Sequence, residues 1–331
     1  MSPAPVIDLI EAFRRSQVMF TAVALGVFDA LAESPASATE LAVKLGAHAG
    51  ATEQLLNACA ALGFLEKRDS TFRNAPITAR YLCSASADSL RGYVMYSHQA
   101  LYPMWAHLDD AVREGGHRWR QTFALDGAIF SHFFRTPEAM HDFLMGMHGF
   151  GMLTSPAVVA AFDLSRFRKL VDLGGATGHL AMAACARYPE MRAIVLELPS
   201  VVANAKPSER VEFVAGDFFT DELPVADLYA LGQVLHDWDE AKIATLLAKI
   251  HRALPDGGGL LIAERLLNDD GVGPVPANMQ SLNMLICTEG RERSAPEYKA
   301  LLRAAGFSHV SARRTGTPRD AILAWKGAKV K

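Results

Sequence analysis

The feature that most constrains the fold is the segment from Leu170 to His179, which reads Leu-Val-Asp-Leu-Gly-Gly-Ala-Thr-Gly-His. A short apolar run is followed by three glycines and then by a helical apolar pattern, so we predict a strand, a tight turn and the start of a helix. Glycine lets a backbone come close to a ligand, and the first turn of a helix offers unpaired N–H groups. The segment therefore predicts a binding site for a nucleotide-like ligand.

The dinucleotide fingerprint fits this turn poorly. A G-x-G-x-x-G pattern counted from Gly174 requires glycine at Ala176 and His179, whereas the other glycines here are Gly175 and Gly178. A nicotinamide oxidoreductase is therefore disfavoured, although it remains an alternative that a binding measurement with NAD would test.

Two later strand patterns, over residues 193–198 and 211–217, also carry an acid at or near their ends. The first acid lies about 20 residues after the glycines, where a carboxylate typically accepts hydrogen bonds from ribose hydroxyls. The second is followed by an aromatic residue, a pair suited to the amine and the face of an adenine ring. Each acid could instead cap a turn, but three such strand ends in succession favour a ligand site. With Asp172 and the three glycines, the residues that we expect there are Glu197, Leu198, Gly216, Asp217 and Phe218.

Strand and helix patterns alternate over residues 166–331, which predicts an α/β domain with a Rossmann-like, doubly wound parallel sheet. Ligands of such sheets bind beyond the carboxyl ends of the strands, where all the signals above fall. Residues 91–165 read as a mostly helical linker that contributes to the substrate pocket.

The N-terminal region, residues 1–90, reads as short helices followed by a hairpin at 64–73, which is the order of a winged helix. A DNA-binding regulator must therefore be weighed. The helix that would enter a major groove, 51–62, contains no Lys or Arg, and residues 1–100 hold eight basic against nine acidic side chains. Phosphate neutralisation dominates DNA affinity, so we expect a packing or dimerisation domain and no nucleic-acid partner.

Composition narrows the class further. The 331 residues are 50% hydrophobic and 21% charged with a net charge of −3, which is ordinary for a globular protein. The four cysteines are scattered in apolar stretches without a C-x-x-C spacing, so we expect buried free thiols, no bound metal and a cytoplasmic location. Apolar stretches such as 19–28 are too short to span a bilayer, so we expect no membrane partner.

Six motifs occur in an order that resembles the S-adenosylmethionine-dependent O-methyltransferases acting on small hydroxylated molecules. They begin at Asp172, Glu197, Gly216, Val234, Pro255 and Thr288, and read DLGGATG, ELP, GDFF, VLHDW, PDGGG and TEGRER. Within that family the motifs are most similar to those of the acetylserotonin O-methyltransferases. The resemblance implies S-adenosylmethionine as cofactor, a winged-helix dimerisation domain that forms a homodimer, and a small aromatic hydroxyl substrate such as a hydroxyindole.

Methylating a hydroxyl requires a group that removes its proton, and histidine suits this because its pKa lies near the working pH. His236 follows the apolar pattern 227–235, which places it at the end of that strand on the ligand edge. The resemblance assigns His236 as the general base, with Glu264 and Glu292 as the acids that orient it. Asp237 either assists His236 or caps the helix predicted from Glu240.

The chain departs from the resembled pattern in its cofactor pocket. Gln233 stands where the family carries a cofactor-contacting Arg, and we expect it to bind the cofactor more weakly than Arg would. Phe134 and Gly151 align with a Tyr and a Trp of that pocket. We include Phe134 and Gln233 among the cofactor-binding residues.

The sequence constrains the identity of the methyl acceptor less than that of the cofactor. Met and Phe residues gather between 143 and 152, either as ordinary core or as the lining of a pocket for a flat ligand. The residues that we expect at the substrate are Phe143 and Met147 from this cluster, with Asn283, Met284 and Cys287 from the resemblance. Two alternatives remain: another acceptor, such as a thiol or a non-indole phenol, and a catalytically silent cofactor-binding regulator.

Overall fold

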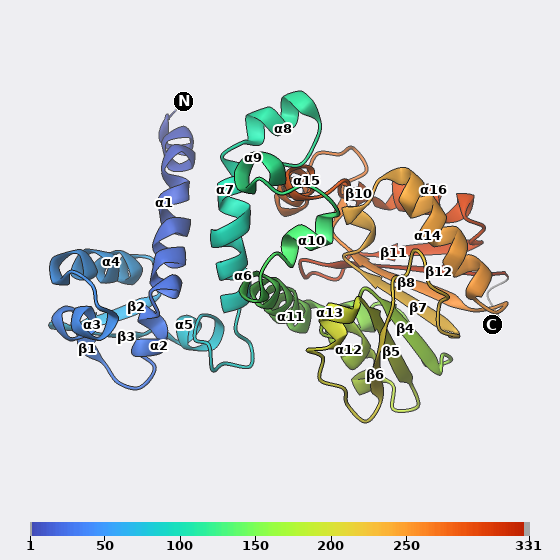
Figure 1. Ribbon diagram of the computed structural model, residues 1–331, viewed down its shortest axis with the longest axis horizontal. Coiled ribbons are helices and arrows are strands. Elements are labelled where there is room, and N and C mark those ends of the chain that lie inside the picture. The colour runs from blue at the N-terminus through green and yellow to red at the C-terminus, as the bar shows by residue number, and fades with distance from the viewer. Residues whose placement is uncertain (1, 328–331) are drawn as a thin grey trace. The chain divides into compact units, whose positions relative to one another are not determined.

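The computed structural model describes residues 2–327, which fall into two compact units (Figure 1). Unit 1 consists of the residues up to Tyr102 together with Phe134–Gly149. Unit 2 consists of Pro103–Phe133 and the residues from Phe150 onward. The segment expected to be a linker, 91–165, is therefore shared between the two units.

Unit 1 begins with the helices and the hairpin that the sequence predicts. Gly26 and Gly63, in the left-handed conformation, follow the first and the fourth helix. Ser37 and Glu40 form the expected capping box. The small sheet has the order β1-β3-β2. The elements are α1 (Ala4–Ala24), α2 (Val27–Ala30), β1 (Ala36–Ser37), α3 (Ala38–Leu45), α4 (Ala49–Ala61), β2 (Leu65–Arg68), β3 (Thr71–Asn74), α5 (Pro76–Tyr81), α6 (Arg91–Tyr96) and the π-helical turn η1 (Ser97–Leu101).

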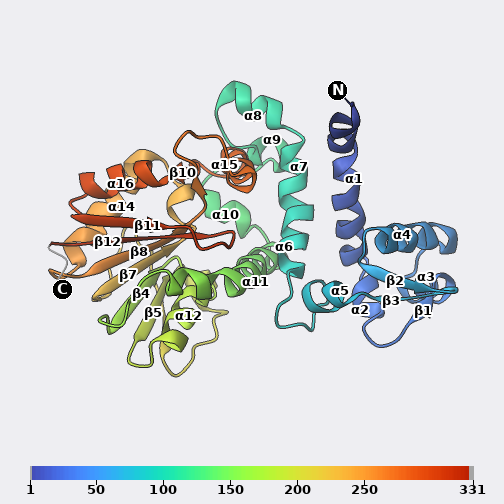
Figure 2. The same ribbon diagram turned by 180° about the vertical axis from the view of Figure 1, so that it is seen from behind.

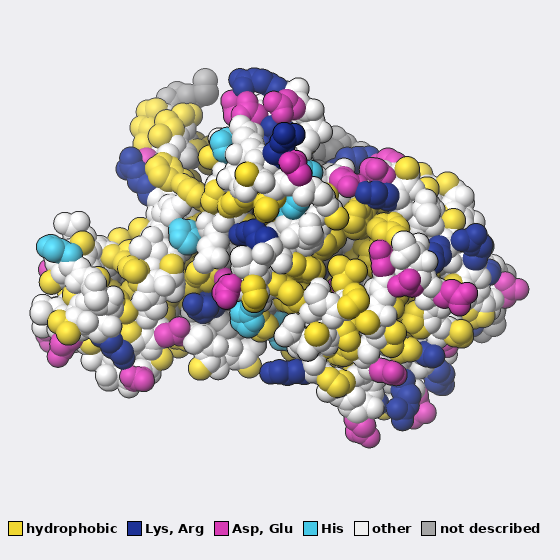
Figure 3. Space-filling view, in the orientation of Figure 1, with side chains coloured by type: hydrophobic (Ala, Val, Ile, Leu, Met, Phe, Trp, Pro, Cys, Tyr) yellow, Lys and Arg dark blue, Asp and Glu magenta, His cyan; other side chains and the backbone are white. Residues whose placement is uncertain are grey.

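The core of unit 1 gathers apolar residues from its helices and its sheet, among them Phe28, Leu56 and Phe72. The first turns of α1 do not join this core. Their exposed apolar residues are Val6, Ile7, Leu9, Ile10 and Phe13, and Figure 3 shows the corresponding hydrophobic atoms over α1. A contiguous exposed apolar surface of this kind is typical of an association site.

Helix α11 (Pro137–Ala160) is 24 residues long and runs through both units. By length and composition it could cross a membrane, so the expectation that every apolar stretch is too short does not hold for this helix. However, 44% of its most apolar window is buried within the protein, and Val158 and Val159 lie in the core of unit 2. A core helix passes the same test, so α11 is weak evidence for a membrane span.

The sheet of unit 2 has the strand order β11-β12-β8-β7-β4-β5-β6. The strands are β4 (Lys169–Leu173), β5 (Arg192–Glu197), β6 (Val211–Ala215), β7 (Leu228–Gly232), β8 (Gly259–Glu264), β11 (His309–Arg313) and β12 (Asp320–Trp325). Strands β4 to β8 are parallel to one another, as predicted. At one edge of the sheet, strand β12 is antiparallel to both β8 and β11, a detail that the sequence pattern did not predict. The connection 314–319 is too short for the crossover that parallel strands need.

Helices cover both faces of this sheet (Figures 1 and 2). α12 (His179–Arg187) and the end of α11 pack on one face, and α14 (Glu240–Ala253) and α16 (Ala295–Ala304) pack on the other. The remaining elements are α7 (Tyr102–Trp105), α8 (Leu108–Glu114), α9 (Trp119–Phe123), α10 (Ile129–Phe133), α13 (Pro199–Val202), η2 (Leu235–Asp237), β9 (Leu266–Leu267), α15 (Val275–Cys287) and β10 (Arg293–Ser294).

The parallel strands all end at one edge of the sheet, which we call the carboxyl edge. Strand β12 runs the opposite way, so it begins at the carboxyl edge, where Asp320 pairs with Glu264 at the end of β8. Residues before β12 therefore join those that follow β4 to β8.

Candidate active site

The turn after β4 is built around the buried side chain of Asp172, whose Oδ2 accepts a hydrogen bond from the N–H of Ala181 in α12 (3.3 Å). Gly175 is required here, because a Cβ at that position would lie 2.6 Å from Cγ of Asp172. Gly174 and Gly178 adopt the left-handed conformation, with φ of +66° and +78°. The glycines thus allow the turn to wrap around the acid and to begin α12.

Glu197 connects the glycine turn to the ends of β5 and β6. Its Oε1 accepts a hydrogen bond from the N–H of Ala176 (3.1 Å), and its Oε2 accepts one from the N–H of Leu198 (2.6 Å). The N–H of Gly216 donates to the backbone oxygen of Glu197 (2.9 Å). Burial raises the pKa of the Glu197 carboxyl, and the two hydrogen bonds oppose that shift.

The third predicted strand end also meets the glycine turn. A Cβ on Gly174 would lie 3.2 Å from Cε1 of Phe218, so this ring approaches the turn closely. Asp217 accepts a hydrogen bond from the N–H of Phe219 (2.8 Å), which is the turn-capping role weighed as an alternative for this acid. The structure therefore brings together the ends of β4, β5 and β6.

A buried acceptor at this place lacks a partner. Oδ1 of Asp172 has no hydrogen-bond partner among the described residues, and burial raises the pKa of this carboxyl to about 7. A ligand that donates hydrogen bonds and carries positive charge would satisfy it. Asp172, Glu197 and the glycine turn thus fit an adenosyl sulfonium cofactor.

Gly151 is explained by its neighbour His179. A Cβ on Gly151 would lie 2.3 Å from the imidazole ring of His179, so any larger side chain is excluded. Nδ1 of the same ring lies 2.9 Å from Oγ of Ser155. The Trp that the resembled family carries at this position therefore has no room in this chain.

His236 lies on η2, between β7 and α14, and is 4% exposed. Its Nδ1 is 2.7 Å from Oε1 of Glu292 and 3.5 Å from Oε2 of Glu264. Its Nε2 is 3.6 Å from Oδ1 of Asp237. All four residues predicted to be catalytic are thus brought together, and we call them the His236 cluster.

The acids of the His236 cluster have unusual proton affinities. Burial raises the pKa of Asp237 and of Glu264 to about 7, and that of Glu292 to about 8. A positive imidazolium at His236 opposes the shift of the first two acids, and Arg265 is the largest opposing charge at Glu292. Groups that are buried together and have pKa values near neutral pH are typical of acid–base sites.

The turn that carries His236 differs from the prediction in two details. β7 ends at Gly232, four residues earlier, so the expectation that His236 directly ends the strand is wrong. The cap of α14 is Asp239, which accepts a hydrogen bond from the N–H of Lys242 (2.8 Å), so the capping interpretation of Asp237 is wrong. A helix begins where the backbone geometry permits, and adjacent acids in a sequence are equivalent candidates for its cap.

Three groups hold this turn in place. Glu264 Oε1 accepts hydrogen bonds from the N–H groups of Val234 (3.2 Å) and Leu235 (3.0 Å). Arg293 is the last residue of the Gly-Arg-Glu-Arg motif, and its side chain is buried. Its Nη1 donates a hydrogen bond to the backbone oxygen of Leu235 (3.3 Å). Gly290 approaches most closely, because a Cβ there would lie 2.2 Å from the backbone oxygen of His236. The Gly-Arg-Glu-Arg motif thus supplies the acid that contacts His236, an arginine that hydrogen-bonds to the turn, and a glycine that passes close to the turn.

Gln233 faces a residue that the sequence analysis missed. The guanidinium of Arg319 donates from Nε (3.1 Å) and Nη2 (2.9 Å) to Oε1 of Gln233. Arg319 directly precedes β12, and its side chain is buried. Arg319 reaches the carboxyl edge because β12 is antiparallel to β8, and the sequence pattern gave no signal for that strand direction.

The substrate residues predicted on α15 are buried at the end of that helix. Oδ1 of Asn283 accepts a hydrogen bond from Nε1 of Trp105 (2.9 Å). The thiol of Cys287 donates to the backbone oxygen of Asn283 (2.9 Å), and Cys287 is fully buried. Met284 is 4% exposed. Contact of these three residues with a substrate stays a prediction.

The remaining predicted residues, Phe134, Phe143 and Met147, belong to unit 1 and are half-buried. The rings of Phe134 and Phe143 are 5.9 Å apart, and Phe143 also contacts Tyr96 edge-on (5.3 Å). Their roles at the cofactor and the substrate likewise stay predictions.

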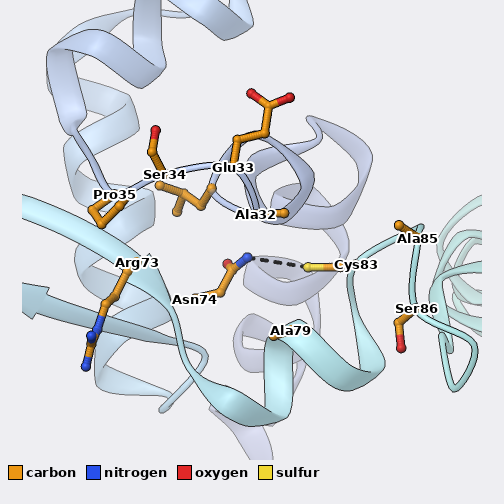
Figure 4. A pocket seen from close by; sticks show the side chains of 11 residues that line it. Ala32, Glu33, Ser34, Pro35, Arg73, Asn74, Ala79, Cys83, Ala85 and Ser86 are labelled. Atoms are coloured by element: carbon orange, nitrogen blue, oxygen red, sulfur yellow. Dashed lines mark hydrogen bonds between the residues drawn. The ribbon is translucent and has the colours of Figure 1, made fainter.

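A pocket of about 590 Å³ opens elsewhere, wholly within unit 1 (Figure 4). It is lined by residues 31–35, by Arg73 and Asn74 of β3, and by side chains between 79 and 86. Asn74 lies at its centre and donates from Nδ2 to Sγ of Cys83 (3.4 Å) and to the backbone oxygen of Phe28 (2.8 Å). Its lining contains no predicted catalytic or cofactor residue, so it is not the candidate active site.

Comparison with known proteins agrees with this geometry. Residues 105–308 match the O-methyltransferase domain, and residues 7–84 match the O-methyltransferase dimerisation domain. Acetylserotonin O-methyltransferase of Bos taurus is 43% identical, with 96% of each chain covered. The crystal structure of human N-acetylserotonin methyltransferase in complex with SAM superimposes with a TM-score of 0.95 at 38% identity, covering 98% of this chain and 97% of that one. PigF with SAH gives a TM-score of 0.90 at 32% identity, covering 98% and 100%. The chain therefore belongs to the O-methyltransferase family, and it is an S-adenosylmethionine-dependent methyltransferase related along nearly its whole length to acetylserotonin O-methyltransferases.

Proposed function

We propose that the chain transfers a methyl group from S-adenosylmethionine to the hydroxyl of a small aromatic molecule, with His236 as the general base. The observation that carries this proposal is the 2.7 Å contact between Nδ1 of His236 and Glu292, at the same sheet edge as the glycine turn. A histidine held by a carboxylate through one nitrogen presents the other nitrogen to a substrate.

The cofactor would be held by the ends of β4, β5 and β6. Asp172 and Glu197 supply carboxyl oxygens, the turn from Gly174 to Gly178 allows close approach, and Phe218 supplies an aromatic face. When bound, S-adenosylmethionine supplies a methyl group on a positively charged sulfur. The protein then has to orient the acceptor and remove its proton.

His236 is positioned for that proton. Burial raises the pKa of Glu292 to about 8; once this carboxyl is ionised, Nδ1 carries the hydrogen of the 2.7 Å bond and Nε2 keeps its lone pair. When Nε2 accepts the hydroxyl proton, the positive imidazolium is stabilised by Glu292 and Glu264 on one side and by Asp237 on the other. The proton thus moves into a buried cluster that holds three acids.

We infer that the acceptor is a hydroxyindole, because the similar proteins include acetylserotonin O-methyltransferases over nearly the whole length. Asn283, Met284 and Cys287 of α15 are the residues of unit 2 that we assign to its recognition. Other phenols and thiols are the competing acceptors.

The test combines an acceptor screen with variants of the base. Methyl transfer is measured with hydroxyindoles, simple phenols, catechols and thiols, and then with His236→Ala on the best acceptor. We expect kcat to fall by about 10²–10⁴-fold and SAH affinity by calorimetry to be unchanged. His309→Ala, on an exposed strand position, serves as the control. A His236→Ala variant at wild-type rate would exclude the base assignment, and SAH binding without transfer to any acceptor would favour the silent regulator.

We further propose that unit 1 uses a winged-helix module to form a homodimer and that the protein works in the cytoplasm. The match to the dimerisation domain and the exposed apolar face of α1 support the dimer. The four cysteines, all buried and free, support a reducing compartment.

A further inference from the structure

Gln233 lies in the turn between β7 and η2, beside the glycine turn that follows β4. A Cβ on Gly174 would lie 3.3 Å from Cγ2 of Val234. A Cβ on Gly232 would lie 3.5 Å from Cδ2 of Leu180 in α12. The residues on both sides of Gln233 therefore approach the glycine turn or the helix that it begins. Gln233 itself has a φ of +57°, which is unfavourable for a residue with a side chain, and such conformations are often found at ligand sites.

The side chain of Gln233 is held in one orientation by Arg319, which directly precedes β12. Nε and Nη2 of the guanidinium donate to Oε1 of Gln233, at 3.1 and 2.9 Å. A guanidinium offers only donors, so the oxygen of the amide, and not its nitrogen, must face it. Arg319 is buried, and its backbone oxygen accepts hydrogen bonds from the hydroxyls of Thr315 and Thr317. The segment before β12 thus fixes which end of the amide points away from Arg319.

That other end, Nε2 of Gln233, is buried and has no hydrogen-bond partner among the described residues. A buried N–H group without an acceptor is destabilising, so this donor implies a ligand that accepts a hydrogen bond. Oδ1 of Asp172 is the complementary case, because it is a buried acceptor without a partner in the described part of the chain. Asp172 pairs with Ala230 of β7, so Asp172 and Gln233 lie at the ends of adjacent strands.

A donor and an acceptor that both need partners match an α-amino acid group. Its carboxylate accepts hydrogen bonds and its ammonium donates them, and both S-adenosylmethionine and SAH carry this group at the end opposite the adenosine. A hydrogen bond from an amide to a carboxylate is charge-assisted, and the positive guanidinium behind the amide favours a negative group in front of it. The carboxylate therefore suits Gln233, and the ammonium suits Asp172.

We propose that Nε2 of Gln233 binds the carboxylate of the methionyl group of the cofactor, and that Arg319 is the positioning residue that holds the amide in the required orientation. The inference rests on the proposed placement of the cofactor at the ends of β4, β5 and β6. It also reverses the expectation that Arg at position 233 would bind the cofactor more tightly. A second guanidinium there would face that of Arg319, so Gln233→Arg should weaken SAH binding.

The test compares SAH with its decarboxylated analogue, which keeps the ammonium but lacks the carboxylate, by calorimetry on the full-length protein. Gln233→Glu is nearly isosteric and keeps an oxygen for Arg319, but it replaces the donor Nε2 with an acidic oxygen. We expect SAH to bind roughly 10–100-fold more weakly, the range for a lost hydrogen bond to a charged group. The analogue should bind at least as tightly as to the wild type. Arg319→Met should weaken SAH by a smaller factor and leave the analogue unchanged.

Two control variants separate the possible failures. Glu197→Ala, at the adenosyl end, should weaken both ligands by the same factor, and if it weakens neither, the cofactor placement is wrong. Arg313→Met removes a cation from an exposed position on the neighbouring strand β11 and should change neither affinity.

A folded Gln233→Glu protein that binds both ligands like the wild type, or that loses the same factor for both, would overturn the inference. An unchanged ratio of the two affinities in Arg319→Met would refute the positioning role of Arg319. Because calorimetry needs no turnover, these outcomes do not depend on His236 or on the methyl acceptor.

Discussion

Gly290 passes so close to the turn carrying His236 that any side chain there must displace the proposed base. A Cβ on Gly290 would lie 2.2 Å from the backbone oxygen of His236 and 2.7 Å from the backbone nitrogen of Trp238. Real Cβ atoms essentially never come within 3.0 Å of such atoms. Gly290→Ala therefore has to separate the two segments by at least 0.8 Å, the difference between 3.0 and 2.2 Å.

This displacement sets the expected magnitudes. Overpacking of a rigid site typically lowers the free energy of unfolding by about 1–3 kcal/mol. Replacing glycine also restricts the unfolded chain, which offsets about 0.4–1 kcal/mol of that loss. Moving a catalytic group by about 1 Å can cost roughly 10²-fold in rate. We therefore expect kcat to fall by about 10²-fold in a protein that is only moderately destabilised.

The matched control is Gly232→Ala at the end of β7. A Cβ at Gly232 would meet Cδ2 of Leu180 at 3.5 Å, which is ordinary van der Waals contact. We expect this variant to keep kcat within about threefold, since surface and well-fitted changes have small effects. Steady-state kinetics, urea unfolding and SAH calorimetry on both variants separate catalysis from folding and cofactor binding. If Gly290→Ala retained wild-type kcat and stability, the close approach of Gly290 to His236 would be refuted.

Three further outcomes are expected. Glu197→Ala should weaken SAH binding by roughly 1–3 kcal/mol, because it removes acceptors for donor groups of the ligand, whereas Glu212→Ala on an exposed position of β6 should not. The acids Asp172, Asp237, Glu264 and Glu292 have folded pKa values raised to about 7 or 8 by burial, so the native state holds more protons than the unfolded chain above about pH 4. Their contribution to stability is therefore fully present below their unfolded pKa values and is lost as pH rises through 7 to 8. Urea unfolding without cofactor should give a free energy of unfolding that falls between pH 5 and 8. A rise in this free energy over that range would contradict the burial argument. Light scattering at micromolar concentration should give a dimer, and Leu9→Ser with Phe13→Ser on the exposed face of α1 should weaken it; an unchanged dimer would place the interface elsewhere.

The cofactor-binding residues at the carboxyl edge were predictable because the sequence signals for them are local. A buried acid, glycines that must adopt positive φ, and an acid about 20 residues later are properties of short segments, and the parallel strands bring their ends together by topology alone. The prediction that His236, Glu264 and Glu292 meet came from the family resemblance, and the structure gives its physical basis in β7, β8 and the segment before β10.

The missed features depend on register and on close contact, which a sequence pattern does not encode. Arg319 reaches the edge only because β12 runs antiparallel to β8. Gly290 is needed only because of the carbonyl that it passes, and no turn pattern marks it. Asp239 replaces Asp237 as the helix cap because the chain makes an extra 3₁₀ turn at η2, and one turn of helix is too short to be recognised from periodicity.

The position of β12 also governs when the active site can form during synthesis. Among the strands of its sheet β12 is made last, yet it lies between β8 and β11, both of which leave the ribosome earlier. A nascent chain that stops before residue 319 thus has the cofactor turn and His236 but neither the strand that pairs with Glu264 nor the guanidinium bound to Gln233. Until that strand inserts, β8 presents an open edge on which another nascent chain can pair. The site therefore matures only after β12 is made, and ribosome-bound intermediates are expected to be selectively vulnerable to mispairing at β8.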